Sequence, residues 1–511
     1  MKIERTKNAT RNIFFGTILK VYQIAVPFFM RTAMIYLLGI QYLGLNSLFT
    51  SILQVLNLVE LGVGSAMVFS MYKPIAEGDH MMICALMKLY RTYYRIIGIV
   101  ILVIGCMLLP FLPYLIKSEV PTDINIYVLY MMNLFATILT YWLFAYKNSI
   151  LQAHQRNDIA IKITIITDTV KYSLQIIVLA VFNNYYYFVI VILFIQIISN
   201  IITAHFANKL YPQYQPIGVL DKSERHRINK RIRDLFTSKV GGIVVNSTDT
   251  IVISAYLGLT TLAIYQNYFY IITAVLGLVS IIFASCTAGI GNSLVTETKE
   301  KNYDDFKKIT FMIAWLAGWF TVCLLCLLQP FMEIWVGKDL MIGFTAIICF
   351  CVYYFVYEIN QLLNLYKDAA GMWHEDRFRP LVTALTNLGL NLILVNFIGI
   401  YGVILSTVLS TILIGMPWLL HNLFTVIFKF NAKQYIFRLF QYVLITGLIC
   451  MITYFIMRFL PDTGNIVFII KMFICCVVPN ILFYSVFKFY PEYKDAKKMI
   501  LRMVKENKNV I

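Results

Sequence analysis

The feature that most constrains the fold is a series of apolar blocks, each about 20 residues long, along the whole 511-residue chain. A helix rises about 1.5 Å per residue, so such a block crosses the roughly 30 Å hydrocarbon core of a bilayer. The apolar residues are consecutive and do not follow the spacing of one face of a soluble helix. With 60% apolar and 14% charged residues, the composition excludes a soluble globular protein. We therefore predict an all-α polytopic membrane protein.

The apolar blocks number fourteen, and short polar breaks separate them. The predicted spans are approximately 12–38, 42–70, 93–116, 124–146, 159–182, 185–208, 237–257, 262–292, 308–329, 343–366, 379–397, 400–424, 438–459 and 466–488. The longest polar stretch, 209–239, is too short to bury a core of its own. No soluble domain is therefore expected.

Basic residues alternate between the two sides of this arrangement. Of the 43 Lys and Arg, 36 fall on the side of the two termini, three on the opposite side and four within spans. By the positive-inside rule the basic side is cytoplasmic, so we predict that both termini are cytoplasmic. The net charge of +17 is explained by topology, and no nucleic-acid partner is predicted.

An internal repeat relates the first six spans to the next six at an offset of about 220 residues. Leu38-Gly39 matches Leu257-Gly258, and His154 matches His374. Two parallel halves around a central site are a plan found in transporters. The expected organisation is a six-helix lobe over 1–208, a basic inter-lobe segment over 209–236, a second six-helix lobe over 237–424, an additional helix pair over 425–489 and a basic cytoplasmic tail over 490–511.

Ionisable side chains within the predicted spans are the main functional signal. At insertion costs of roughly 2.5–3.5 kcal/mol each, eight uncompensated charges would cost on the order of 20 kcal/mol. They must therefore face one another or a water-filled cavity. The eight are Lys20, Arg31, Glu60, Asp168, Lys171, Asp249, Glu358 and Lys471.

The first span carries cations along one stripe. At about 100° per residue, Lys20, Gln23 and Arg31 share one face of that helix. Arginine meets a phosphate with a bidentate fork, whereas lysine acts as a point charge. We expect this stripe to line a polar path through the membrane.

The acidic residues have two interpretations each. Asp168 and Lys171 are three residues apart and can pair, either as a structural ion pair or as part of the path. Asp249 has no cation at good spacing on its own helix, so a partner such as Lys20 or Arg31 is expected. Glu358 is a candidate for handling a substrate or an ion. A carboxylate in the path can hold a proton or Na⁺ and exchange it on each cycle.

Glu60 lies in a glycine-containing segment. Gly62 and Gly64 permit close helix approach or local unwinding, and Glu60 then has either a packing role or a gating role.

Several other functions are excluded. The ten cysteines lie almost entirely within spans, and the six histidines show no ligand spacing, so no metal site is predicted. No cofactor is predicted apart from a coupling ion, Na⁺ or H⁺. The connections on the non-basic side include Gly39–Gln41 and Asn183–Asn184, which are too short for an enzyme of lipid-linked sugars. The chain is therefore predicted not to be an enzyme.

Three motifs resemble those of a known superfamily. They are LGIQYLGLN at 38–46, ELGVGSA at 60–66, and YLG at 256–258 followed by Ile264 and Tyr265. With them the chain resembles the multidrug/oligosaccharidyl-lipid/polysaccharide exporter superfamily, and within it the bacterial (Wzx-like) flippases of O-antigen and capsular repeat units. The resemblance implies two six-helix lobes in a V-shaped arrangement around a cationic cavity, with two extra helices. It also implies an undecaprenyl-diphosphate-linked oligosaccharide as substrate.

The expected function is thus a flippase in the bacterial cytoplasmic membrane that works by alternating access. Lys20, Gln23, Arg31 and Lys171 are expected to bind the substrate, and Glu60, Asp168, Asp249 and Glu358 to gate the path or couple an ion. The expected partners are the lipid-linked oligosaccharide, the membrane, a polysaccharide polymerase and glycosyltransferases, with the chain itself a monomer.

Two alternatives stay open. A cation-coupled multidrug or metabolite antiporter is disfavoured because drug-exporting relatives commonly have twelve spans and an acidic residue in the first. A lipid II flippase is disfavoured because that relative uses several cavity arginines, and only Arg31 lies within a span here.

Overall fold

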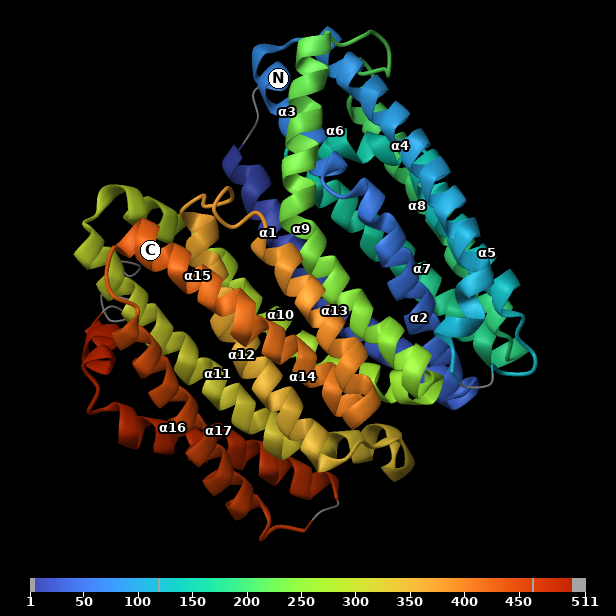
Figure 1. Ribbon diagram of the computed structural model, residues 1–511. Helices are drawn as coiled ribbons and strands as arrows, with labels where there is room; N and C mark the ends of the chain where they lie inside the picture. The colour runs from blue at the N-terminus through green and yellow to red at the C-terminus, as the bar shows by residue number, and fades with distance from the viewer. Residues whose placement is uncertain (1–4, 118–119, 462–463, 499–511) are drawn as a thin grey trace. The chain divides into compact units, whose positions relative to one another are not determined.

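The computed structural model describes residues 5–117, 120–461 and 464–498, and every regular element within these ranges is helical (Figure 1). In this part of the chain, 13 helices are long and apolar enough to cross a membrane. The number becomes 14 if the bent pair Ile126–Trp142 and Ala145–Ala153 is one span. The predicted all-α membrane fold is therefore confirmed. By their contacts the residues form two compact units, Met1–Ala263 (unit 1) and Ile264–Ile511 (unit 2).

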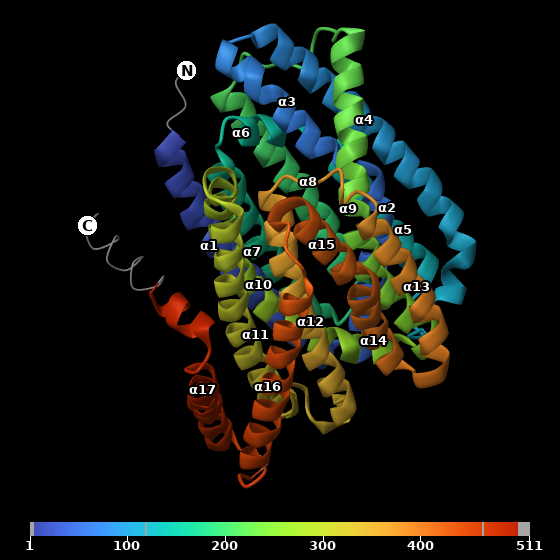
Figure 2. The same ribbon diagram turned by 60° about the vertical axis from the view of Figure 1, so that its left-hand side comes forward.

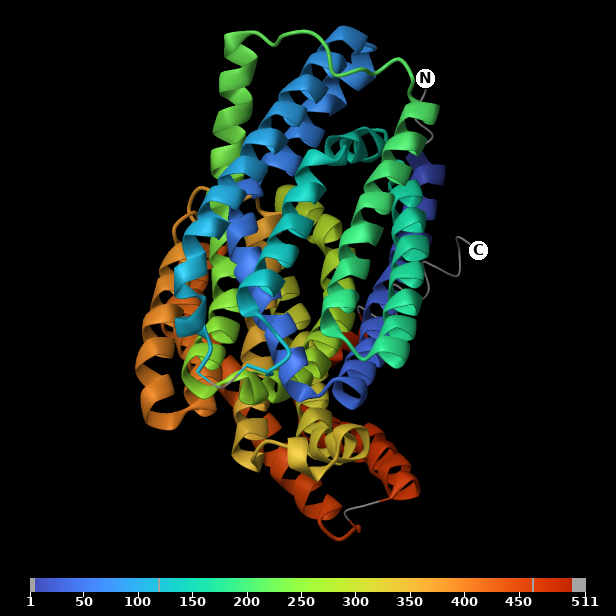
Figure 3. The same cartoon turned by 90° about the vertical axis from the view of Figure 1, so that its right-hand side faces the viewer.

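Unit 1 contains long helices interrupted by short 3₁₀ turns. Its elements are α1 (Arg5–Leu37), α2 (Ile40–Leu56), η1 (Asn57–Glu60), α3 (Val63–Glu77), α4 (His80–Leu108), η2 (Leu109–Leu115), α5 (Ile126–Trp142), η3 (Ala145–Lys147), α6 (Asn148–Ala153), α7 (Asn157–Phe182), α8 (Tyr185–Leu210) and α9 (Lys222–Leu257). Helix α7 packs against both α1 and α8 (Figure 3).

Unit 2 contains longer unbroken helices and two π-helical turns. Its elements are α10 (Leu259–Thr296, which begins within unit 1), α11 (Lys299–Val336), η4 (Lys338–Leu340), α12 (Phe344–Ala369), α13 (Arg379–Ile398), α14 (Ile400–Ser410), η5 (Thr411–Gly415), α15 (Met416–Asn422), η6 (Leu423–Phe428), α16 (Lys433–Met457) and α17 (Asn465–Phe487). Helices α16 and α17, the predicted additional pair, pack against α11 and against each other (Figure 2).

Several helix bounds follow the offset of the predicted internal repeat. Helix α1 ends at Leu37 and α9 ends at Leu257, while α4 begins at His80 and α11 begins at Lys299. The broken pair α2–α3 corresponds to the continuous α10, and α5–α6 corresponds to α12. The repeat therefore preserves the helix order but not the continuity of the helices.

The boundary between the contact-defined units falls later than the basic segment 209–236 that we expected to separate two lobes. Helix α9 begins at Lys222, inside that segment, and packs against α2 and α3 of unit 1. The expected lobe limits follow the repeat, whereas the contacts follow packing. The lobe limits thus remain a prediction.

Two breaks interrupt the spans of unit 1. Gly62 has a φ of +90°, and a Cβ there would lie 2.9 Å from Cβ of Leu235 on α9. The predicted local unwinding and close helix approach at this glycine are therefore confirmed. The second break follows Trp142, where Phe144 has a φ of +58° and the axes of α5 and the next helical segment differ by 46°. No motif in the sequence predicts this second break.

Candidate functional site

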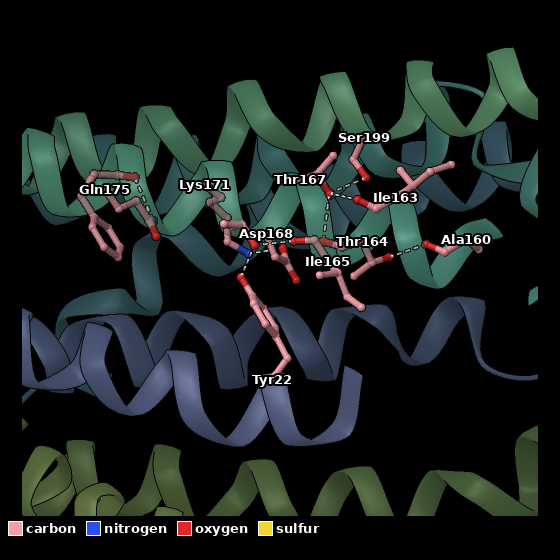
Figure 4. A network of polar contacts seen from close by, with 12 residues as sticks. Tyr22, Ala160, Ile163, Thr164, Ile165, Thr167, Asp168, Lys171, Gln175 and Ser199 are labelled. Atoms are coloured by element: carbon pink, nitrogen blue, oxygen red, sulfur yellow. Dashed lines mark hydrogen bonds and ion pairs between the residues drawn. The ribbon is translucent and has the colours of Figure 1, made fainter. Parts of the chain in front are cut away.

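Helix α7 carries an ion pair within its membrane-spanning stretch. The Nζ atom of Lys171 lies 2.6 Å from Oδ1 of Asp168, one turn earlier on the same helix (Figure 4). The two side chains are 21% and 24% exposed, so part of each is accessible from outside the protein interior. The ammonium group also lies 4.4 Å from the ring centroid of Tyr172. The pairing that the spacing predicts is confirmed.

Helix α1 contributes a tyrosine beside this pair. The Tyr22 hydroxyl lies 3.0 Å from Oγ1 of Thr169, the residue that follows Asp168 (Figure 4). Tyr22 is 200° around the helix from Lys20 at about 100° per residue, so it is not on the predicted cationic stripe. Sequence reasoning missed Tyr22 because a single tyrosine in an apolar span carries no distinctive pattern.

The predicted cationic stripe of α1 is only partly buried. Lys20 and Gln23 are exposed, and Arg31 is half-buried. The substrate-binding roles assigned to these three residues remain predictions. The described contacts bring Lys171 together with Asp168 but place no residue of the stripe in that pair.

Other side chains on the polar face of α7 have structural partners, although the buried Oε1 of Gln175 has no hydrogen-bond partner within the described ranges. Thr167 donates to the Ile163 carbonyl at 2.9 Å and lies 3.4 Å from the Ser199 hydroxyl on α8. Gln175 is 1% exposed and donates to the Phe188 carbonyl at 3.4 Å. Such bonds satisfy polar groups that would otherwise be unfavourable inside an apolar span. On this face, the Asp168–Lys171 pair is therefore the group whose interaction a ligand could replace.

Glu60 ends the η1 turn and accepts a hydrogen bond from a tyrosine pair. The Tyr94 hydroxyl donates to Oε1 of Glu60 at 3.2 Å, and the Tyr90 hydroxyl donates to that of Tyr94 at 2.5 Å. Both tyrosines are on α4, one turn apart, so the i, i+4 spacing is a signal from which this pair could have been found. A Cβ at Gly64 would lie 3.1 Å from Oε1 of Glu60.

The remaining two predicted acids are buried on separate helices. Asp249 on α9 is 7% exposed, and Glu358 on α12 of unit 2 is 1% exposed. Within the described ranges, the Glu358 carboxylate has Tyr354 of the same helix as a hydrogen-bonding neighbour, but neither of its oxygens makes a hydrogen bond of good geometry. Burying a polar group without a well-formed hydrogen bond is unfavourable, and such groups are uncommon in native structures.

No group of three or more His, Cys, Asp or Glu side chains that could hold a metal ion occurs among the residues that the structure describes.

Comparison with solved structures identifies the fold. The lipid II flippase MurJ in an inward closed conformation matches with a TM-score of 0.66 and 17% identity, covering 93% of this chain and 99% of that one. An inward-facing multidrug resistance MATE family transporter of the MOP superfamily matches with a TM-score of 0.56 and 15% identity over 79% of this chain and 96% of that one. A mutant of the Vibrio cholerae MATE transporter VcmN matches with a TM-score of 0.53 and 14% identity, covering 83% and 99%.

At these identities the comparison establishes the fold: this chain is a multi-pass membrane protein with the architecture of MurJ and the MATE transporters. No protein-family model matches the sequence, and no curated protein matches it.

Proposed function

We propose that this chain is a flippase that moves undecaprenyl-diphosphate-linked oligosaccharide repeat units across the bacterial cytoplasmic membrane, for capsule, O-antigen or exopolysaccharide assembly. The observation that carries the proposal is the half-buried Asp168–Lys171 pair in a spanning helix. A diphosphate can replace Asp168 as the partner of the Lys171 ammonium, because both are anionic oxygen acceptors. The pair is then a gate that opens when the substrate arrives.

The other roles follow from charge. The diphosphate is bound on α1 by Lys20, Gln23 and Arg31. The charges of Asp249 and Glu60 favour the closed or the open state of the gate. Glu358, buried on α12 beside Tyr354, takes and releases the coupling ion, Na⁺ or H⁺. Alternating access moves the substrate, both termini are cytoplasmic, and the chain works as a monomer beside the polymerase and glycosyltransferases of its pathway.

The neighbours with this fold are transporters rather than enzymes, which supports a transport function without chemistry on the substrate. A lipid II flippase is the second candidate, supported by the TM-score of 0.66 to MurJ. Arg31 is the one arginine that lies well away from the ends of a predicted span, which favours a substrate other than lipid II.

The test is a vesicle assay with purified protein and a fluorescent undecaprenyl-diphosphate oligosaccharide. Replacing Lys171 with glutamine removes a charged hydrogen bond, so we expect translocation to slow about tenfold or more. Lys162→Gln is the matched control, since Lys162 is on the same helix and 44% exposed, 3.8 Å from Asp158. Equal rates for Lys171→Gln and wild type, at equal amounts of folded protein, would contradict the proposal.

A further inference from the structure

The two breaks in unit 1 border one cavity. It has a volume of about 470 Å³ and is lined from one break by Glu60 and Gly62 and from the other by Phe144 and Ala145. Helices α4, α6, α7 and α8 complete the wall. At about 30 Å³ per water molecule, the cavity has room for far more than a bare ion. Its size falls within the range of about 300–1,000 Å³ that is usual for small-molecule sites.

The wall of this cavity is polar but almost uncharged. The side chains that face it include four amides and many hydroxyls, and Glu60 is the only ionisable carboxylate or amine among the lining residues. The four amides belong to Asn148, Gln152, Gln196 and Asn200. Drug-sized apolar ligands favour walls made mainly of hydrophobic side chains, so this wall does not suit them. An anionic group is also disfavoured, since no Lys or Arg lines the cavity and Glu60 would repel it.

One of these amides, that of Asn148, has an atom without a hydrogen-bond partner in the described part of the chain. That atom is the side-chain oxygen, which is buried. A buried amide oxygen without a partner is uncommon, and a rotation of the Asn148 side chain would offer it to a donor in the cavity. By contrast, the Asn200 amide already donates to the Thr140 carbonyl at 3.4 Å.

The tyrosine pair gives the cavity an aromatic side. The rings of Tyr90 and Tyr94 lie 4.3 Å apart between centroids, and both residues line the cavity. A tyrosine ring combines an apolar face with a hydroxyl that bonds to polar groups. Amides, hydroxyls and tyrosine rings together match a ligand that has hydroxyl groups around its edge and C–H groups on its faces.

We infer that this cavity binds an uncharged sugar ring, and that in the transport cycle the ring is one residue of the lipid-linked oligosaccharide. The second clause rests on the proposed function, whereas sugar binding by the cavity does not. The Asn148 oxygen accepts from a sugar hydroxyl once its side chain rotates, the other amides bond to neighbouring hydroxyls, and the small exposed part of Tyr90 and Tyr94 contacts the C–H face. The anionic diphosphate is excluded from the cavity and meets the cations of the path.

The test measures binding without transport. Purified full-length protein in lipid nanodiscs is titrated with methyl glycosides of glucose, galactose and mannose, with N-acetylglucosamine and with N-acetylgalactosamine, and binding is followed by saturation-transfer NMR. Glucuronate, inorganic diphosphate and NaCl are titrated in parallel. We expect at least one neutral glycoside to bind saturably and glucuronate to bind more weakly.

The variants test the residues. Loss of the Asn148 amide should weaken glycoside binding about tenfold in Asn148→Leu, the effect of one to two hydrogen bonds. Asn133→Leu is the matched control, because Asn133 donates to the Leu129 carbonyl of its own helix and does not line the cavity. If Asn148→Leu fails to fold, Thr203→Val removes a lining hydroxyl at nearly constant volume and should also weaken binding.

The inference is overturned if no neutral glycoside binds, or if Asn148→Leu and Thr203→Val bind as wild type does. It is also overturned if Na⁺ alone binds saturably and Glu60→Gln abolishes that binding, which would make the cavity a cation site. Glycoside binding without translocation in the vesicle assay would instead contradict the proposed function and leave the sugar site standing.

Discussion

The polar cavity of unit 1 and the apolar cluster of unit 2 occupy corresponding places in the repeat. In unit 1 the cavity is bordered by η1 and α3, by α4, by η3 and α6, and by α7 and α8. In unit 2 the elements α10, α11, α12 and the stretch from α15 to η6 pack around buried aromatic and aliphatic side chains together with α16. Phe306 at its centre is fully buried, with ring centroids 4.7 Å from Tyr366 and 4.8 Å from Phe428. One helix order therefore supports two kinds of interior.

The difference originates in the backbone. Gly62 adopts a left-handed conformation that ends one helix before the next begins, whereas Ile282 occupies the position 220 residues later inside the continuous helix α10. A β-branched residue avoids positive φ, so the second copy cannot break in the same way. Unbroken helices bring their side chains into a dry contact, whereas broken ones leave polar groups around a cavity. Unit 1 thus has a polar cavity in its interior where unit 2 has an apolar cluster.

The largest expected effect is on the apolar cluster. Phe306→Ala removes a fully buried ring and should lower the free energy of unfolding by about 3–5 kcal/mol. Thr203→Ala in the cavity wall should lower it by about 1 kcal/mol or less, since its hydroxyl bonds to the Ser199 carbonyl of its own helix. Thermal unfolding of both variants in detergent measures the contrast. Equal losses would break the comparison, because the cavity wall would then be as tightly packed as the cluster.

A smaller expected effect is on the pH dependence of stability, in which the two histidines of the repeat, His154 and His374, should differ. His154 is 8% exposed and stacks on Tyr211 at 4.2 Å between ring centroids, whereas His374 is exposed. Burial lowers the pKa of His154 below its ordinary 6.5. The unfolded chain therefore binds the proton at a higher pH than the folded one. The stability that neutral His154 provides is complete above about pH 6.5 and is lost as the pH falls further.

The free energy of unfolding of His154→Phe, measured from about pH 4.5 to about pH 8, checks this dependence. This range brackets the ordinary histidine pKa of about 6.5. The variant keeps an aromatic ring on Tyr211 and should lose the part of the acid sensitivity that His154 supplies. His374→Phe is the control and should leave the pH profile unchanged. If both variants gave the wild-type profile, the buried histidine would not distinguish the two halves.

Much of the fold could be predicted because a bilayer imposes strict lengths and charge rules. Apolar blocks of span length were sufficient to predict a number of spans close to the 13, or 14 with the bent pair, among the described residues. A spacing of three was sufficient for the Asp168–Lys171 pair. Tyr22 and Tyr94 could not be assigned to Thr169 and Glu60, because the partners come from helices distant in the sequence.

Other features had weaker signals. The turn at Phe144 uses a positive φ at a bulky residue, for which the sequence offers no glycine or asparagine to mark it. The exposure of Lys20 and Gln23 depends on how α1 is rotated about its axis. A spanning helix is apolar both where it meets protein and where it meets lipid, so its sequence has little periodicity that would predict this rotation.

The most direct measurement is a comparison of substrates in one vesicle preparation. Wild-type protein is reconstituted, and movement across the bilayer is followed for an undecaprenyl-diphosphate oligosaccharide, for lipid II and for a cationic dye. The account predicts that the protein accelerates movement of the oligosaccharide-linked lipid well above protein-free vesicles and leaves the other two unchanged. Acceleration of lipid II or of the dye alone, or of none of the three, would contradict it.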